Sequence, residues 1–451
     1  RPIITAEDTE AMAFVKLGSG AIMLGYYMYH GGTNPIGELT TLQESRDTGF
    51  PNDLPKLTYD YQAPLGEYGQ SHPSYRALRR LHLFAKDHEE ILTKGSVIIP
   101  DDKKIRPDDP SSLRYSIRYL KDSGFIFVNN YQHNLTMEPQ ENLNFKVEID
   151  NEVIHFPTVH LKSGQWRLLP FNQELSGVKL KCATVQPLTR LESDTDVYYF
   201  YYGEADNEIE YHFDTATIKN VISGTSSIND YGLTVIKQKF NESNSILDPV
   251  VIENQNGIRV NIITLTKEQA SQLNRIEING KTYIVITEAD TLLEEDQLQL
   301  ISLGKEEATV LTFPALPAEQ KLSEYIDNSP SGIFARYCVK WLPVKPNVAL
   351  NKIGISDQGH LQYELQAAEG FMEGCSDVFL FIDFEGDIAE ITQDGRLKAD
   401  WFYNGLTWKI GLKRFAKELT KGKWLLDISP LYEDAYVFLN KWPKMSDGKA
   451  L

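Results

Sequence analysis

The chain has 451 residues, and its 45 lysines and arginines against 63 aspartates and glutamates give a formal charge of −18. At roughly 150 residues a domain, this length predicts about three domains. With 41% hydrophobic residues, the chain has enough apolar mass for several cores, which excludes wholesale disorder. An acidic chain repels phosphate backbones and anionic lipid surfaces, so we expect neither a nucleic acid nor a membrane as a partner.

The cysteines and histidines give no sign of a disulfide framework or a metal site. Cys182, Cys338 and Cys375 are odd in number, far apart and outside any C-x-x-C pattern. The nine histidines include no pair at metal-ligand spacing on a predicted helix, since His82 and His88 are six residues apart and do not align. These residues therefore give no reason to expect a metal, and no organic cofactor is expected either.

Residues 1–95 carry the signals of an α/β unit. A hydroxyl followed by acids at Thr5–Glu10 predicts a helix start, and Gly18 and Gly20 predict its end. The apolar run Ala21–Tyr29 then predicts a strand buried on both faces, as in a parallel sheet covered by helices. A long loop rich in glycine, asparagine and proline follows, from about His30 to Lys56.

A second helix is predicted from Pro73, a residue that is tolerated at the first helical position. Its apolar stripe comprises Tyr75, Leu78, Leu81 and Ala85, while the opposite face is basic, with Arg76, Arg79, Arg80 and Lys86. The order helix, strand, loop, helix is typical of the tail of an α/β unit.

From about Ser96 the hydrophobic period becomes two, which predicts strands. A β-sandwich is expected to end near Asp214, with a linker at Ser223–Ser227. A small β-rich region with a helical insert at Thr266–Leu273 follows, and Pro314–Pro317 marks a second break. The strands predicted most clearly are 114–120, 124–128, 145–149, 197–202, 377–383 and 424–428. The predicted domains are residues 1–95, 96–214, 215–335 and 336–451.

Two segments combine aromatic, polar and glycine residues, Tyr26–Asn34 and Thr58–Gly69. In α/β folds the carboxyl ends of the strands face the ligand crevice. Gly31 and Gly32 allow the backbone to turn where a Cβ would clash. A tyrosine suits a sugar, because its ring stacks on C–H groups while its hydroxyl bonds to oxygens. Each tyrosine taken singly is also compatible with ordinary packing.

These two segments closely resemble the end of the catalytic barrel in glycoside hydrolase family 35, the β-galactosidases. The resemblance rests on the sequence Gly-Gly-Thr-Asn after an aromatic strand and on Tyr59-Asp-Tyr-Gln-Ala-Pro-Leu-Gly-Glu67. Further stretches look like the β-domains of the family, namely 124–132, 170–172, 183–188, 395–397 and 400–405. The resemblance implies α/β structure followed by all-β structure: the tail of an incomplete (β/α)8 barrel, then β-sandwich and jelly-roll domains.

By position, the resemblance implies that Tyr27 and Tyr61 line a galactose pocket, with Tyr27 near the nucleophile and Tyr61 on the sugar. His30 and Asn34, on the same loop, complete the candidate substrate-binding residues. Gln62 stands where the family often has Asp, and Pro35-Ile36 where Phe-Gly is usual. These departures leave the substrate preference open.

The two catalytic glutamates of the family have no match in this sequence. A retaining glycosidase needs two carboxylates about 5–5.5 Å apart, and in the family both glutamates lie upstream of the part that matches this chain. Glu7, Glu38, Glu44 and Glu67 match neither role, and Glu67 is interpreted as structural. Because the sequence begins at Arg1 and not at Met, we expect that an upstream segment has been removed. No catalytic residue is therefore assigned within this chain.

The resemblance implies part of a retaining β-galactosidase-like glycoside hydrolase acting on terminal β-galactosides, inactive alone. Its expected partners are a galactoside or other glycan, and either the missing barrel segment or a second copy of the chain. A periplasmic or secreted location is expected for the intact enzyme. The alternative is a non-catalytic carbohydrate-binding or scaffolding β-sandwich protein, in which Trp401, Trp408 and Trp424 form either a sugar platform or a core. A third interpretation is a structural β-protein that binds no glycan.

Overall fold

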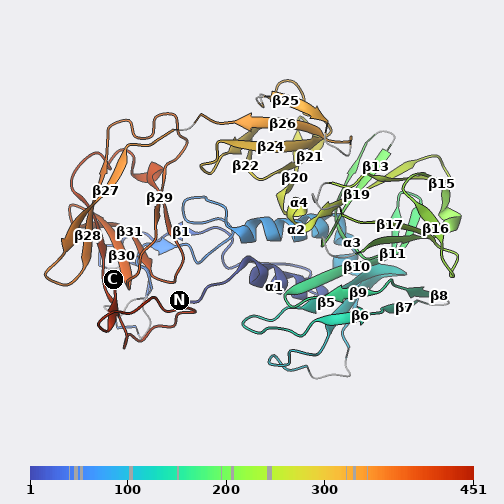
Figure 1. Cartoon of the computed structure of the whole chain (residues 1–451), viewed down its shortest axis with the longest axis horizontal. Coiled ribbons are helices and arrows are strands. Elements are labelled where there is room, and N and C mark those ends of the chain that lie inside the picture. The colour runs from blue at the N-terminus through green and yellow to red at the C-terminus, as the bar shows by residue number, and fades with distance from the viewer. Residues whose placement is uncertain are drawn as a thin grey trace. The chain divides into compact units, whose positions relative to one another are not determined.

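The chain forms two compact units. Unit 1 comprises Arg1–Thr5, Tyr26–Pro73 and Leu342–Leu451, and unit 2 comprises Ala6–Gly25 and Ser74–Trp341. Both are dominated by β-strands, as expected (Figure 1). The computed structural model describes residues 1–39, 41–44, 49–50, 54–100, 105–149, 152–193, 196–204, 208–240, 246–320, 322, 324–328, 332–342 and 344–451.

A β-sandwich makes up most of unit 2. Its first sheet is antiparallel and consists, in spatial order, of β16 (Ser226–Ile228), β17 (Thr234–Gln238), β14 (Ile209–Phe213), β11 (Val178–Ala183), β10 (Gln165–Leu175), β5 (Ser123–Asn130), β4 (Arg114–Leu120) and β3 (Ser96–Ile98). Its second sheet consists of β12 (Gln186–Glu192), β13 (Asp196–Gly203), β19 (Arg259–Thr266), β18 (Val250–Asn254) and β15 (Ile218–Ser223). In the second sheet β13 and β19 run parallel.

The sandwich core forms where alternate side chains of both sheets meet. Leu180, Tyr211 and Phe213 of the first sheet pack with Val260 and Ile262 of the second, and all five are fully buried. The alternation of apolar and polar residues in the sequence therefore correctly predicted strands that bury one face in the core. Two hairpins cover part of the outer face of the first sheet: β6 (Gln140–Leu143) with β9 (Val159–Leu161), and β7 (Lys146–Ile149) with β8 (Glu152–His155).

The sandwich continues past the boundary predicted at residue 214. Residue 214 lies between β14 and β15, which belong to the two sheets of one sandwich. The predicted linker Ser223–Ser227 is also wrong, because Ser223 ends β15 and Ser226 begins β16. The serine and glycine residues of this stretch form a turn between two edge strands. Such a turn has the same amino-acid composition as a linker between domains. The strand ladder of the sandwich ends at Thr266.

A smaller sheet follows in unit 2. Its helical insert α4 (Lys267–Gln272) confirms the predicted one, and Thr266 closes a capping box with Gln269. The predicted break at Pro314–Pro317 and the boundary at 335 both fall inside this sheet, because β24 pairs with β26. The strands are β20 (Leu273–Ile278), β21 (Lys281–Thr287), β24 (Glu307–Phe313), β26 (Ala335–Lys340) and β25 (Glu324–Asn328), with a hairpin of β22 (Asp290–Glu294) and β23 (Gln297–Ile301).

The two predicted helices of residues 1–95 form, and both lie in unit 2. Helix α1 (Ala6–Gly18) lies beside β5 and β10 (Figure 1), with the Phe14 ring 5.0 Å from the Phe127 ring. The buried Arg118 guanidinium donates to the Leu17 carbonyl oxygen at 2.9 Å and to that of Leu92. It thereby satisfies the free carbonyl groups at the ends of α1 and of α3 (Glu89–Lys94).

The basic face predicted for the second helix is not solvated. Helix α2 (Pro73–Asp87) buries Leu78 and Leu81 as expected, but Arg80 is also buried and pairs with Glu10 at 2.5 Å. Arg76 pairs with Asp290 at 3.0 Å, and Arg79 donates to the Ser271 carbonyl oxygen at 2.6 Å. A hydrophobic pattern cannot show this, since it does not reveal acceptors that lie 70 residues earlier, as for Arg80, or 192 and 214 residues later, as for Arg79 and Arg76.

The β-structure of unit 1 comes mainly from the last part of the chain. One sheet consists of β27 (Val348–Ile355), β28 (Leu361–Ala367), β33 (Trp424–Ile428), β30 (Ile388–Gln393) and β31 (Arg396–Phe402). The pair β29 (Phe379–Ile382) and β32 (Trp408–Gly411) contributes Trp408 to the same core as Trp424. Both rings are 1% exposed, so these two tryptophans belong to the core and not to a sugar platform. A last short pair is β34 (Leu431–Tyr432) with β35 (Lys449–Ala450).

The strand predicted at Ala21–Tyr29 does not form. This run has no strand assignment, and Met23 and Tyr27 are 84% and 86% exposed. A strand buried on both faces needs a parallel neighbour on each side, and the described part of residues 1–95 contains only the two-residue strands β1 (Gly32–Thr33) and β2 (Thr58–Tyr59), which pair antiparallel. The described part of residues 1–95 therefore shows no parallel strands of the kind that a (β/α)8 barrel contains.

Within the described residues, no helix is long and apolar enough to cross a membrane. Cys182, Cys338 and Cys375 are not joined in disulfides.

Candidate functional site

Three tyrosines of the two singled-out segments meet on the surface of unit 1. The Tyr27 and Tyr59 hydroxyls are hydrogen-bonded to each other, and the Tyr59 and Tyr61 rings make an edge contact with centroids 4.6 Å apart. Tyr27 is 86% exposed and Tyr61 is 48% exposed. The Tyr61 hydroxyl accepts a hydrogen bond from the Gln43 side chain at 2.7 Å. Tyr27 and Tyr61 are thus brought into one exposed group, which we call the tyrosine cluster (Tyr27, Tyr59 and Tyr61).

The backbone around Tyr61 is set by the buried Asp60. Tyr61 and Gln62 both have left-handed φ values, 48° and 55°. Asp60 supports this turn, because its Oδ1 accepts from the Gln62 N–H at 3.0 Å and its Oδ2 from the Glu67 N–H at 2.8 Å. An aspartate side chain that caps its own turn is the usual way to hold two such residues. The Asp60 carboxylate therefore positions Tyr61 and is itself only 4% exposed.

Gly31 allows the two segments to approach. The Gly31 N–H donates to the Leu65 carbonyl oxygen at 2.7 Å, and the Leu65 N–H donates to that of Tyr29 at 3.0 Å. A Cβ at Gly31 would lie 2.8 Å from the Glu67 nitrogen and 2.9 Å from the Asp60 Cα. At the adjacent Gly32, a Cβ would meet nothing within 4 Å. Of the two glycines, only the first is required by close approach.

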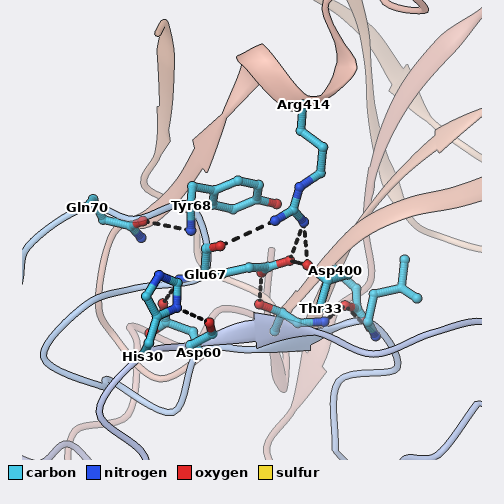
Figure 2. A network of polar contacts seen from close by, with 11 residues as sticks. His30, Thr33, Asp60, Glu67, Tyr68, Gln70, Asp400 and Arg414 are labelled. Carbon is cyan, nitrogen blue, oxygen red and sulfur yellow. Dashed lines mark hydrogen bonds and ion pairs between the residues drawn. The ribbon is translucent and has the colours of Figure 1, made fainter. Parts of the chain in front are cut away.

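A buried carboxylate, Glu67, joins both segments to the last β-domain (Figure 2). The Thr33 and Thr58 hydroxyls both donate to it, and Arg414 donates to its Oε1 at 3.0 Å. The Arg414 guanidinium also lies over the Tyr68 ring, 4.6 Å from its centroid. Glu67 is 6% exposed and fully engaged, so its role here is structural.

Asp400 attaches the second segment to strand β31. Its carboxylate accepts from three consecutive backbone N–H groups, those of Lys56, Leu57 and Thr58, at 3.1 and 2.9 Å for the latter two. Burial raises the pKa of Asp400, and these three hydrogen bonds oppose the shift. The start of β2 is therefore held by a side chain more than 340 residues away in the sequence.

The remaining two candidate residues lie on the same loop. His30 is exposed, and its Nδ1 donates to the Gly31 carbonyl oxygen. The Asn34 backbone N–H donates to the Leu57 carbonyl oxygen at 2.8 Å, and its side chain donates to that of Lys56 at 3.3 Å. In this structure Asn34 thus holds the loop and is half-buried, whereas His30 is exposed.

The hydroxyls of Tyr26, Tyr59 and Tyr61 keep their protons at neutral pH. The hydrogen bond with Tyr27, followed by burial, raises the pKa of Tyr59 to about 12. Burial raises the pKa of Tyr26 to about 12 as well, and it also raises the pKa of Tyr61. Each hydroxyl can consequently both donate and accept a hydrogen bond, which is what a sugar hydroxyl or ring oxygen requires.

An open cavity of about 810 Å³ in unit 1 borders on Tyr61. Asp60, Tyr61 and Gln62 line one part of it, and Trp401 and Tyr436 line another. The sequence singled out Trp401, but Tyr436 and Phe438 escaped notice. Residues 435–438, Ala-Tyr-Val-Phe, are a short apolar run of the kind found in ordinary strands, yet no strand forms there.

Of the described carboxylates near the tyrosine cluster, Asp60 and Glu67 do not form a catalytic pair with each other. Asp60 and Glu67 are both buried and hold backbone or hydroxyl groups. A retaining glycosidase requires two carboxylates that both reach the sugar. Within the described residues, no group of three or more histidine, cysteine, aspartate or glutamate side chains has the geometry of a metal site.

Part of the chain that contains the tyrosine cluster resembles a known protein family. Residues 4–84 match glycosyl hydrolases family 35, so this stretch is similar to sequences of that family. It contains α1, the tyrosine cluster and most of α2. The matched stretch is divided between unit 1 and unit 2 and does not form a compact body of its own.

Two plant proteins are among the relatives. Beta-galactosidase 3 of Oryza sativa subsp. japonica is 39% identical over 91 residues, which are 20% of this chain and 9% of that protein. Beta-galactosidase 10 of Arabidopsis thaliana is 35% identical over 91 residues, 20% of this chain and 11% of that protein. The chain thus matches about a tenth of the length of these relatives.

Proposed function

We propose that this chain is part of a retaining β-galactosidase-like glycoside hydrolase that acts on terminal β-galactosides. The observation that carries the proposal is the tyrosine cluster, which lies exposed within the stretch that matches the family. In this proposal the cluster forms one wall of the sugar pocket. Tyr27 donates a hydrogen bond toward the nucleophilic carboxylate, and Tyr61 bonds to the sugar. His30 lies at the rim, and Asn34 holds the loop.

The reaction itself needs two further carboxylates. One attacks the anomeric carbon and forms a glycosyl-enzyme, while the other protonates the leaving oxygen and then activates the water that releases galactose. Because Asp60 and Glu67 are buried in structural roles, the proposal places both catalytic groups on polypeptide outside this sequence. The chain alone is then inactive.

Exposed apolar residues of unit 2 support a missing neighbour. Met12 and Val15 lie one turn apart on α1 and are 58% and 40% exposed, while Ile22 and Met23 just after the helix are 68% and 84% exposed. Four such residues within twelve positions are unusual for a surface in water. In the proposal, further barrel polypeptide covers them, and the run Ala21–Tyr29 becomes a strand when parallel neighbours are present.

The experiment is sugar binding by the 451-residue chain, measured by saturation-transfer NMR with methyl β-D-galactopyranoside. The proposal expects weak binding that decreases in Tyr27→Phe and Tyr61→Phe, because each loses a hydroxyl that bonds in the pocket. Tyr432→Phe is a matched control, since this tyrosine of unit 1 is 51% exposed and lies outside the cluster. Binding that is unchanged in both cluster variants would contradict the proposal.

The second candidate is a non-catalytic carbohydrate-binding or scaffolding protein. The cavity bordered by Trp401 and Tyr436 supports it, because aromatic residues line the cavity without any catalytic pair. Sugar binding that survives Tyr27→Phe and Tyr61→Phe but is lost in Trp401→Ala would favour this candidate. No binding to any member of a glycan panel would favour the third interpretation, a structural β-protein.

A further inference from the structure

A second cleft lies in unit 2, outside the stretch that matches the family. It has a volume of about 990 Å³ and opens between the hairpins and the outer face of the first sandwich sheet. Phe156 and Val159 of the hairpins form its apolar side, and they belong to the core that the hairpins make with this sheet. The floor is polar and comes from strands β10 and β14.

The floor of the cleft contains buried side chains of both positive and negative charge. Arg167 on β10 is 1% exposed, and Glu210 and His212 on β14 are each 8% exposed. Glu210 and His212 are two residues apart on one strand, so their side chains lie on the same face of the sheet. That face is the outer one, because the alternate residues Tyr211 and Phe213 lie in the sandwich core.

The proton on His212 can be assigned from its partner. The Glu210 carboxylate lies 3.0 Å from His212 Nε2 and 2.5 Å from Lys237 Nζ. The hydrogen bond from His212, together with Lys237, lowers the pKa of Glu210 to about 2. The carboxylate is thus ionised and can only accept, which requires that Nε2 carries the hydrogen. The other ring nitrogen, Nδ1, is then an acceptor in the neutral imidazole.

That acceptor is unsatisfied. Nδ1 of His212 is buried and has no hydrogen-bond partner within the described residues. A buried polar atom without a partner costs about 1–3 kcal/mol, so it points to a group that arrives from outside. The group must donate a hydrogen bond, because it meets a lone pair.

An aromatic pair stands at the edge of the same cleft. The His155 and Tyr231 rings are stacked, with centroids 4.6 Å apart and planes 7° from parallel. Tyr231 is 64% exposed and lies between β16 and β17. An aromatic ring beside polar groups suits a ligand with one apolar face and several hydroxyls.

We propose that this cleft is a binding site for a neutral saccharide, in which one hydroxyl donates to His212 Nδ1 and the ring packs against Tyr231. The mixed charge of Arg167 and Glu210 favours a ligand without net charge, and a hydroxyl serves both because it donates and accepts. A carboxylate ligand is ionised at neutral pH and has no proton for Nδ1, and a phosphate would bring net negative charge close to the Glu210 carboxylate. The site is separate from the tyrosine cluster and does not depend on its function.

The test uses the 451-residue chain with the methyl glycosides of galactose, glucose and mannose, first by saturation-transfer NMR and then by titration. At least one of these sugars should bind, and Tyr231→Ala should weaken it by about tenfold, the value of one aromatic stacking contact. Tyr231 is exposed, so this variant should fold. His212→Phe, which keeps a ring but removes Nδ1, should weaken the same sugar. With ¹⁵N-labelled histidine, the Nδ1 resonance of His212 should shift when the sugar binds.

Controls separate this site from the tyrosine cluster. The shift of the His212 Nδ1 resonance reports on this cleft alone, and it should be unchanged in the exposed control Tyr432→Ala, which lies in unit 1. The proposal is overturned if none of the three sugars shifts the His212 resonance, or if the sugar concentration needed for that shift is unaffected by Tyr231→Ala. It is also overturned if inorganic phosphate shifts the His212 resonance and the sugars do not, since the ligand class would then be an anion.

Discussion

Gly31 and Gly32 form a matched pair for testing how the site is built. In Gly31→Ala the new Cβ would meet the Glu67 backbone nitrogen and the Asp60 Cα below 3 Å, whereas in Gly32→Ala it would meet nothing within 4 Å. We expect Gly31→Ala to destabilise unit 1 by about 1–3 kcal/mol, as other overpacked positions do, and Gly32→Ala to change stability by less than about 0.5 kcal/mol. Urea unfolding measures both. Equal stability of the two variants would contradict the close approach of the segments.

His88 provides a pH-dependent test. Burial lowers its pKa to about 4, while a histidine in the unfolded chain titrates near 6.5. Between these values the unfolded chain binds more protons, so the contribution of His88 to stability is complete above pH 6.5 and is lost as the pH falls toward 4. We expect His88→Phe to reduce the loss of stability between pH 6.5 and 4.5 by roughly 2 kcal/mol.

The measurement is urea unfolding of the parent chain, His88→Phe and the control His160→Phe at several pH values. His160 is suited as a control because its side chain is 46% exposed. If the stability curve of His88→Phe runs parallel to that of the parent between pH 6.5 and 4.5, the buried neutral histidine is not responsible for the pH dependence.

The sequence predicted some of these residues and not others for a physical reason. The role of Gly31 was visible because a diglycine after an aromatic run signals a backbone turn locally. The partners of Glu67 and of the Lys56–Thr58 backbone were not visible, because Arg414 and Asp400 lie more than 340 residues away and carry no local pattern. The orphaned nitrogen of His212 depends on burial between a sheet and two hairpins, which no spacing rule describes.

Helix α1 stabilises the sandwich through one face. Phe14 is 2% exposed and packs on Phe127, whereas the adjacent Val15 is 40% exposed. We expect Phe14→Ala to cost about 3–5 kcal/mol, the usual range for a buried phenylalanine. Val15→Ala should be within about 0.5 kcal/mol, since alanine is the better helix former. Urea unfolding followed by far-UV circular dichroism measures both variants. A similar loss in the two would mean that α1 does not dock by this face.

Some predicted helices and strands are confirmed and others are wrong, because some depend on residues within the element and others on residues far away in the sequence. Both helices of residues 1–95 and the strands 114–120 and 424–428 are confirmed. The residues that predict these elements, a helix cap or an alternation of apolar and polar residues, lie within the elements themselves. The strand at Ala21–Tyr29 is wrong, because a doubly buried strand is defined by neighbours and not by its own composition. Arg80, predicted on the basic face opposite the apolar stripe, is buried for a related reason, since its partner Glu10 lies on another helix.

At the level of the whole chain, domain boundaries were the least predictable feature. The stretch 223–227 has linker composition but joins β15 to β16 within one sandwich. The matched stretch 4–84 contributes to both units. Composition indicates where the chain can turn, whereas only strand pairing shows which turns stay inside a domain.

The division into two units predicts separable unfolding. Calorimetry of the 451-residue chain should show at least two transitions, because cooperative units of different stability open separately. Gly31→Ala should lower the temperature of one transition, that of unit 1, and Phe14→Ala should lower the other. A single transition that both variants lower equally would show that the units unfold as one.

The account as a whole rests on the proposal that the chain supplies a sugar-facing tyrosine wall and that the catalytic carboxylates come from elsewhere. The most direct measurement is the rate at which the purified 451-residue chain hydrolyses p-nitrophenyl β-D-galactopyranoside. We predict no release of p-nitrophenol above the rate in buffer. Turnover at an enzymatic rate that is abolished by replacing a carboxylate of this chain would contradict the account.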